Sequence, residues 1–232
     1  MIDVPQTEYK KQISTMRSWL DGKGYHLALK AFEFAQKHHK GTRKDGVSPE
    51  FSHQMFIANY AMSILPGLMF KEETLAAIFL HDVCEDYHVK IEQIEEMFGQ
   101  DVAQAVRLLT KKTPGEKIPE HEKELRNRRY YEKLATDPIA SMAKGLDRAH
   151  NILTMKAAGW TLEKQKAYLQ EAISLVLPML KEARRTFTEQ RLAYENVKSL
   201  ILIQAQHINF NLQMMKQLQE QAEVTEPAAI KL

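Results

Sequence analysis

The chain of 232 residues carries 32 Lys and Arg against 30 Asp and Glu, and this net charge of +2 provides no overall attraction for nucleic acid or an acidic membrane surface. A hydrophobic content of 44% and a charged content of 27% are typical of a folded globular protein and exclude a disordered chain. Because only 9 Gly and 8 Pro occur, turn-forming residues are scarce and long helices are expected.

Neither a membrane span nor an export signal is expected. The longest unbroken apolar stretch runs from Leu75 to Leu80, far short of the ~20 residues that a bilayer span requires. The first residues, which include Asp3 and Glu8, lack the hydrophobic segment of a signal peptide. The single cysteine, Cys84, excludes an internal disulfide and fits a reducing compartment. We therefore expect a soluble, cytoplasmic protein.

Apolar residues at three- and four-residue spacing predict a series of helices in the first half of the chain. These helices are expected over residues 25–39, 52–65, 72–83, 90–98 and 101–109. Between the first two, a stretch that contains Gly, Pro and Ser predicts a loop over residues 40–51.

The second half of the chain is also helix-forming. Helices are expected over residues 120–134 and 138–158, and Asp137 is placed to cap the second of them. Residues 162–221 contain little punctuation apart from Pro178, which we expect to interrupt the helix. Because no strand alternation or hairpin signal occurs, the sequence predicts an all-α helical bundle.

The chain is divided into a main domain, residues 1–159 with a core at 25–157, and a C-terminal helical extension, residues 160–232. We expect the extension to pack on the domain and about its last ten residues to fray. In its later part, Leu200–Leu218, apolar residues are interspersed with Gln and Asn. This part could instead form a homo-oligomer contact, although packing on the domain is the favoured interpretation.

Two adjacent polar residues, His81 and Asp82, follow the longest apolar stretch. Neighbours on a helix point about 100° apart, so both can reach one metal ion only at a cleft or a helix end. A buried aspartate is costly without a partner, and a cation removes that cost. Glu85 and Asp86 lie four residues further on, where a general base would act on water. A capping histidine followed by a solvated acidic helix end fits the segment equally well.

Three further segments carry candidate site residues. Lys144, Asp147 and Asn151 share one helix face by their spacing, although a salt-bridged surface helix is the simpler interpretation of that segment alone. A single histidine at a helix start, such as His53, is more often a cap or a core residue than a ligand. Arg43 and Lys44 could grip phosphates or be solvated loop charges.

Together the segments indicate more than each does alone. Two imidazoles and two carboxylates come from three separate helices, and such a mixed set suits a divalent first-row ion such as Mn²⁺, Fe²⁺ or Zn²⁺. The four residues are His53, His81, Asp82 and Asp147. This pattern resembles that of the HD phosphohydrolase superfamily.

Within that superfamily the chain resembles the hydrolase domain of the Rel/SpoT alarmone enzymes and their small stand-alone relatives. The resemblance covers about residues 25–157 and rests on four motifs in order. They are His39–Arg43, His81–Asp86, Thr110–Lys111 and Lys144–Asn151. The resemblance implies an HD domain that removes pyrophosphate from the 3′ position of guanosine tetra- or pentaphosphate.

The resemblance also implies roles for individual residues. His53, His81, Asp82 and Asp147 would hold one Mn²⁺, and Glu85 and Asp86 would position or activate the attacking water. The nucleotide would be contacted by Arg43, Lys44, Lys144 and Asn151. The expected partner is thus the alarmone substrate, with no nucleic acid and no membrane.

Departures from the family pattern leave alternatives open. The loop from Gly46 to Gln54 is one residue longer than usual, so a preference for guanine or adenine is not fixed. Gly145-Leu146 stands where leucine-alanine is usual. The first alternative is an HD phosphohydrolase acting on an adenosine alarmone, a nucleoside 5′-monophosphate or NADPH. The second is a nucleotide-binding protein or an antitoxin that neutralises an alarmone synthetase.

Overall fold

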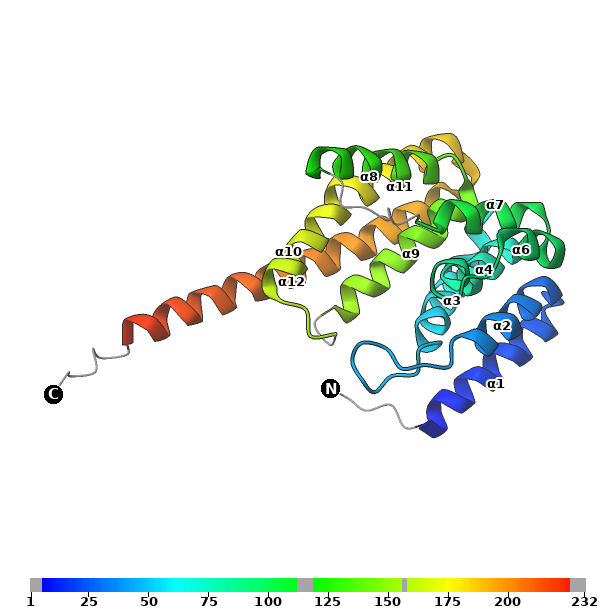
Figure 1. Cartoon of the computed structure of the whole chain (residues 1–232), viewed down its shortest axis with the longest axis horizontal. Helices are drawn as coiled ribbons and strands as arrows, with labels where there is room; N and C mark the ends of the chain where they lie inside the picture. The colour runs from blue at the N-terminus through cyan, green and yellow to red at the C-terminus, as the bar shows by residue number, and fades with distance from the viewer. Residues whose placement is uncertain (1–5, 112–118, 156–157, 226–232) are drawn as a thin grey trace.

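A computed structural model describes residues 6–111, 119–155 and 158–225, and over these ranges the chain is built from helices without a β-sheet, which confirms the all-α prediction (Figure 1). The first helices are α1 (Gln6–Gly22), α2 (His26–His38), α3 (Ser52–Ile64), α4 (Lys71–Leu80), α5 (Val83–Asp86), α6 (Ile91–Phe98) and α7 (Gln100–Leu109). The later ones are α8 (Glu120–Leu134), α9 (Pro138–Thr154), α10 (Leu162–Glu171), α11 (Leu177–Thr186) and α12 (Arg191–Thr225).

Helix α4 forms the centre of the N-terminal half. Its residues from Thr74 to Leu80 are all buried, as expected for a helix that is apolar on every side. Helices α2, α3, α7 and α9 contact it. The ring of Phe79 lies 5.4 Å from Phe32 of α2, edge to face, which helps to fix the angle between the two helices.

Helix α9 connects the N-terminal half to the extension. Asp137 caps it as predicted, because its carboxylate accepts hydrogen bonds from the amides of Ile139 and Ala140. A Cβ atom at Gly145 would lie 2.9 Å from Leu180 of α11 and 3.0 Å from Val197 of α12. The glycine therefore allows α11 and α12 to approach α9 closely.

The extension differs from the prediction at two places. Pro178 does not interrupt the helix, because it follows a π-helical turn over Ala172–Val176 and occupies the first turn of α11, where a missing amide hydrogen is tolerated. The break comes instead at Phe187, whose backbone leaves the helical region. Helix α12 then continues to Thr225 and extends away from the bundle (Figure 1). Fraying was expected over about the last ten residues; α12 includes the first three of these, and the others lie outside the described residues.

One helix was not predicted at all. Helix α1 is strongly polar, and among its described side chains only Met16 and Leu20 are buried. Ile13 and Trp19 also pack against the core but are only partly buried, and these few apolar residues in a strongly polar segment of 17 give a weak periodic signal.

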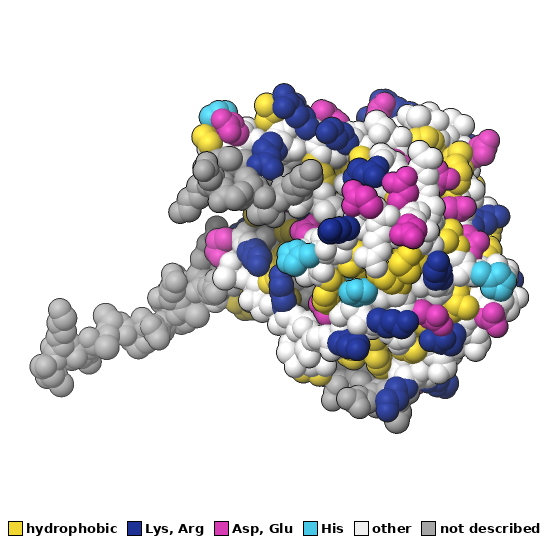
Figure 2. Space-filling model, turned by 45° about the vertical axis from the view of Figure 1, so that its right-hand side comes forward, with side chains coloured by type: hydrophobic (Ala, Val, Ile, Leu, Met, Phe, Trp, Pro, Cys, Tyr) yellow, Lys and Arg dark blue, Asp and Glu magenta, His cyan; other side chains and the backbone are white. Residues whose placement is uncertain are grey.

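The surface carries no dominant sign of charge on the face seen in Figure 2, where basic and acidic side chains are intermingled. This arrangement agrees with the net charge of +2. Across the described ranges, no helix combines the length and the apolar character that crossing a bilayer demands.

Candidate functional site

The segment between α4 and α5 places two polar side chains at a helix end. Helix α4 stops at Leu80, three residues before the predicted end, since the chain turns at His81 and Asp82. His81 closes α4, and Asp82 precedes α5. Their side chains converge, with Nε2 of His81 lying 3.0 Å from Oδ2 of Asp82. This is the geometry that two adjacent ligands need to reach one ion.

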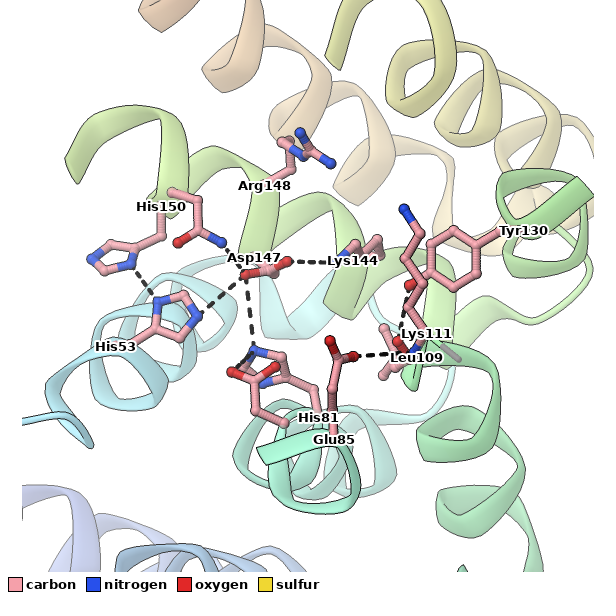
Figure 3. A network of polar contacts seen from close by, with 12 residues as sticks. His53, His81, Glu85, Leu109, Lys111, Tyr130, Lys144, Asp147, Arg148 and His150 are labelled. Atoms are coloured by element: carbon pink, nitrogen blue, oxygen red, sulfur yellow. Dashed lines mark hydrogen bonds and ion pairs between the residues drawn. The ribbon is translucent and has the colours of Figure 1, made fainter. Parts of the chain in front are cut away.

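Two further helices bring their polar side chains to the same point (Figure 3). His53 lies in the first turn of α3, and its Nε2 is 3.2 Å from Oδ1 of Asp147 on α9. The same oxygen is 3.9 Å from Nε2 of His81. Donor atoms of His53, His81 and Asp82 all lie within 4.8 Å of one another. The structure thus brings together the four side chains that the sequence singled out as metal ligands.

The proton arrangement on His81 fits a cation at this point. Its Nδ1 lies 2.8 Å from the carbonyl oxygen of Ile78, and because a carbonyl only accepts, Nδ1 is the donor. In the neutral ring Nε2 then carries the lone pair, which cannot hydrogen-bond to the carboxylate oxygen of Asp82 that faces it at 3.0 Å. Burial opposes protonation, but the carboxylates of Asp82 and Asp147 raise the pKa of His81 to about 9. The site therefore attracts positive charge to Nε2, for which a proton and a metal ion compete.

Asp147 is held in place from both sides. Its Oδ2 accepts a hydrogen bond of 2.8 Å from Nζ of Lys144, and its Oδ1 accepts one of 2.5 Å from Nδ2 of Asn151. Burial acts to raise the pKa of Asp147, but Lys144 and His53 hold it well below its usual range. The three residues do share one face of α9. Lys144 does form the ion pair with Asp147 that the surface-helix alternative expected, but Asp147 is buried, Lys144 and Asn151 are half-buried, and the pair lies on the wall of a cavity rather than on a surface helix.

The two candidate water-activating acids differ in their surroundings. Glu85 accepts a hydrogen bond of 3.1 Å from the backbone amide of Lys111, which fixes one of its oxygens. Partial burial and the neighbouring carboxylates of Asp82 and Glu85 raise the pKa of Asp86 to about 6. A carboxylate with this pKa is ionised at neutral pH and is still basic enough to accept a proton.

All ten candidate site residues line one cavity of about 670 Å³. They are Arg43, Lys44, His53, His81, Asp82, Glu85, Asp86, Lys144, Asp147 and Asn151. This volume falls in the range of roughly 300–1,000 Å³ of small-molecule sites. Its wall is mostly polar and charged, which suits an anionic ligand rather than an apolar one.

Sequence reasoning missed one end of the cavity. There Arg148 is buried, and its Nη2 donates to the Tyr131 hydroxyl at 2.6 Å and to Glu171 at 2.8 Å. Its guanidinium lies 3.9 Å from the ring centre of Tyr168 on α10. Lys111 stacks over Tyr130, 5.4 Å from the ring centre. These contacts join α8, α9 and α10, so no spacing along one helix could predict them.

A second residue to which the sequence gave no role, His150, lies against the ring of His53. Its Nδ1 is 2.6 Å from Nδ1 of His150, and both rings are buried. Burial, together with nearby His53 and Arg43, lowers the pKa of His150 to about 3. The only signal in the sequence was that His150 lies three residues after Asp147.

Comparisons with known proteins point to one family. A sequence model of the HD domain matches residues 31–179 of this chain. A probable guanosine-3′,5′-bis(diphosphate) 3′-pyrophosphohydrolase of Synechocystis sp. is 34% identical over 155 residues, which are 66% of this chain and 20% of that relative. A probable GTP pyrophosphokinase of Mycobacterium leprae is 30% identical over 161 residues, 66% of this chain and 19% of that relative. The chain thus spans about a fifth of the length of these curated relatives.

A solved structure is also similar in fold. It is that of "A metazoan ortholog of SpoT", a protein said to hydrolyse ppGpp and to play a role in starvation responses. The TM-score is 0.55 at 25% sequence identity, and the match covers 74% of this chain and 93% of the other. The likeness therefore extends over nearly all of that chain, whereas the match to the curated relatives above covers about a fifth of their length.

Proposed function

The chain belongs to the HD domain family, and from that premise we propose that it is a metal-dependent hydrolase that removes the 3′-pyrophosphate from guanosine tetra- or pentaphosphate. The observation that carries the proposal is the cavity itself. Four candidate metal ligands, from α3, α9 and the turn between α4 and α5, lie on its wall together with cationic side chains and two acids. The names of the similar proteins support the choice of alarmone as the substrate class.

In this proposal His53, His81, Asp82 and Asp147 hold one divalent ion, for which we propose Mn²⁺. A mixed imidazole and carboxylate set is also suitable for Fe²⁺ or Zn²⁺. When bound, the ion supplies Lewis acidity, which lowers the pKa of a water and offsets charge on phosphoryl oxygens. Asp147 keeps its place through Lys144 and Asn151, and His81 keeps its orientation through the Ile78 carbonyl.

The two acids share the handling of water. Asp86, with a pKa near 6, accepts the proton of the attacking water. Glu85, whose carboxylate is tied to the amide of Lys111, orients that water toward the 3′ phosphorus. Both residues lie on the cavity wall next to the ligand His81–Asp82 pair.

The cationic residues hold the polyphosphate. Arg43 donates to the Thr154 hydroxyl at 3.4 Å and keeps further guanidinium donors for a phosphate, which arginine can bind through two parallel hydrogen bonds. Lys44 and Lys144 add positive charge, and Asn151 completes the wall near the ligands. Arg148 supports the site indirectly, because its hydrogen bonds to Tyr131 and Glu171 hold α8 and α10 against α9.

We also propose that α12 joins two copies of this chain. Its buried side chains include Ile201, Ala205 and Leu212, which face the bundle. A second apolar stripe lies on the opposite face, where Ile203, Phe210 and Met214 are 64%, 60% and 42% exposed. These three belong to a heptad-like series that also contains Leu200 and His207.

The flanks of that stripe favour a second copy over a charged partner. No Asp, Glu, Lys or Arg occurs between Lys198 and Lys216, and the polar residues there are Ser, Gln, Asn and His. A charged partner would find no oppositely charged side chain on this part of α12. An identical helix presents the same uncharged stripe and is therefore complementary to it. Two α12 helices would bury both stripes against each other.

The hydrolase proposal is tested with purified protein and Mn²⁺. We expect release of pyrophosphate from guanosine 3′,5′-bisdiphosphate, with the adenosine analogue, a nucleoside 5′-monophosphate and NADPH assayed in parallel. Asp82→Ala should abolish the release, and Asp21→Ala, an exposed substitution at the end of α1, should leave it unchanged. Metal binding without turnover of any of these nucleotides would contradict the proposal and favour a binding protein.

A further inference from the structure

Two buried histidines touch through the same ring nitrogen. Nδ1 of His53 and Nδ1 of His150 are 2.6 Å apart, and the ring centres are 4.8 Å apart. A hydrogen bond between two imidazole nitrogens needs one donor and one acceptor. One of these atoms therefore carries a proton and the other carries a lone pair.

The contact allows two proton arrangements, and they differ at the far side of His53. If His150 donates, then Nε2 of neutral His53 carries a proton and can donate to Oδ1 of Asp147 at 3.2 Å. If His53 donates, its Nε2 carries a lone pair that faces the same carboxylate oxygen. Only the second arrangement offers Nε2 to a metal ion, because a ligating imidazole nitrogen must be unprotonated.

We propose that His150 is a positioning residue, which accepts the Nδ1 proton of His53 and so holds His53 in the tautomer that binds the metal through Nε2. This inference rests on the metal centre in the proposed function. His150 is itself well fixed, since it lies on α9 and its ring centre is 4.3 Å from that of Phe56. Figure 3 shows the resulting series of polar contacts from His150 through His53 to Asp147.

The two histidine ligands are then oriented by different means. His81 donates to the carbonyl of Ile78, and because a carbonyl can only accept, the tautomer of its neutral ring is fixed. The imidazole of His150 can either donate or accept, so the tautomer of His53 can change. When it changes toward the metal-binding form, the proton lost from Nε2 of His53 is balanced by one gained at Nε2 of His150. Metal binding at His53 is thereby coupled to a rearrangement in its neighbour.

Two substitutions of His150 distinguish its role as a hydrogen-bond acceptor from the packing of its ring. His150→Phe keeps an aromatic ring against Phe56 and removes the acceptor, whereas His150→Asn places a carbonyl oxygen near the former Nδ1. We expect calorimetric titration of the nucleotide-free protein with Mn²⁺ to give about 10–100-fold weaker binding for the Phe variant. The Asn variant should recover most of that loss, which a purely space-filling role would not predict.

A matched control is available on α2. His38 is a second histidine with a ring contact, and its Nδ1 lies 2.9 Å from the carbonyl oxygen of Phe34, outside the cavity wall. His38→Phe should bind Mn²⁺ as the wild type does. Equal Mn²⁺ affinity for His150→Phe and the wild type would overturn the inference and leave the hydrolase proposal intact.

A second measurement needs no substitution. With ¹⁵N-labelled histidine and diamagnetic Zn²⁺, nuclear magnetic resonance should show His53 protonated at Nδ1 and unprotonated at Nε2 in the loaded protein. A proton on Nε2 of His53 in that state would refute the inference even if His150→Phe failed to fold. If the tautomer is as expected but no alarmone is hydrolysed, only the proposed function fails.

Discussion

The wall of the cavity and the exposed apolar stripe of α12 both place side chains where folded proteins rarely place them, the first by burying charge and the second by exposing apolar groups. At the cavity wall His53, His81 and Asp147 are ionisable groups that are 4–5% exposed. On α12 the apolar Ile203 and Phe210 are at least 60% exposed. Buried charge and exposed apolar surface each cost free energy unless something is bound there. In the functions proposed above, a cation offsets this cost in the first region and a second copy of the chain offsets it in the second.

The largest effect should come from removing the carboxylate of Asp147, which contacts both Lys144 and the candidate metal ligand His53. Asp147→Ala deletes a metal ligand and leaves the buried ammonium of Lys144 without its carboxylate. We expect loss of Mn²⁺ binding and of hydrolysis, and a free energy of unfolding lower by about 3–5 kcal/mol. Mn²⁺ binding is measured by calorimetry, hydrolysis by a turnover assay and the free energy of unfolding by urea unfolding.

A double substitution separates stability from function at the same position. Lys144→Met combined with Asp147→Leu removes both buried charges, and it should recover most of the lost stability without restoring metal binding. Asp101→Ala, which changes an exposed carboxylate on α7, serves as the control for all three measurements. Full hydrolysis by the double variant would show that this part of the wall holds no ion.

A second effect concerns the acid with the raised pKa. Asp86→Asn should lower turnover by about 10²–10⁴-fold, because the proton acceptor is lost. Its pKa of about 6 lies above the usual carboxyl value of ~3.9, so ionisation disfavours the folded state. Wild-type stability is therefore lost as the pH rises from about 4 to about 6, and this loss persists at higher pH.

The same variant should consequently gain stability while it loses activity. Thermal melts of metal-free protein at about pH 8, above both carboxyl pKa values, should place Asp86→Asn above the wild type. At a pH below about 3.5 both carry a neutral group at this position, so the difference should vanish. A lower melting temperature for the variant in the alkaline buffer would contradict the assignment of the raised pKa.

On α12 the test is the introduction of charge into the exposed stripe. Phe210→Glu places a carboxylate at the centre of the proposed seam, and we expect the dimer to dissociate at least tenfold more readily while turnover is unchanged. Asn209→Glu adds the same charge on the flank of the helix and should remain dimeric. Sedimentation velocity compares the three proteins. A wild type that is monomeric at every concentration would leave the stripe without its proposed partner.

The smallest effect is expected between the two regions, where α9 packs against α11 and the first turns of α12. Gly145→Ala puts a methyl group 2.9 Å from Leu180 and 3.0 Å from Val197, so α11 and α12 must shift away from α9. We expect a loss of about 1–3 kcal/mol in stability. Gly22→Ala on α1 is the matched control, since nothing lies within 4 Å of its added carbon. Urea unfolding that shows the same stability for both variants would mean that the close approach at Gly145 is dispensable.

The features best predicted from the sequence are those that depend on the spacing of residues within one helix. The helical segments of the N-terminal half, the cap at Asp137 and the shared face of Lys144, Asp147 and Asn151 follow from local spacing. The convergence of His53 with Asp147 needed the resemblance to a family, because 94 positions separate the two residues along the chain. Arg148 and His150 stayed unrecognised, since their partners lie on other helices and no pattern along α9 indicates them.

The most direct test of the account is where the metal binds. Crystals of the protein grown with Mn²⁺ and measured at the manganese absorption edge should contain one strong anomalous peak. We expect the ion at this peak to be coordinated by Nε2 of His53, Nε2 of His81 and carboxylate oxygens of Asp82 and Asp147. An anomalous map without a peak between these side chains, at a Mn²⁺ concentration that supports hydrolysis, would contradict it.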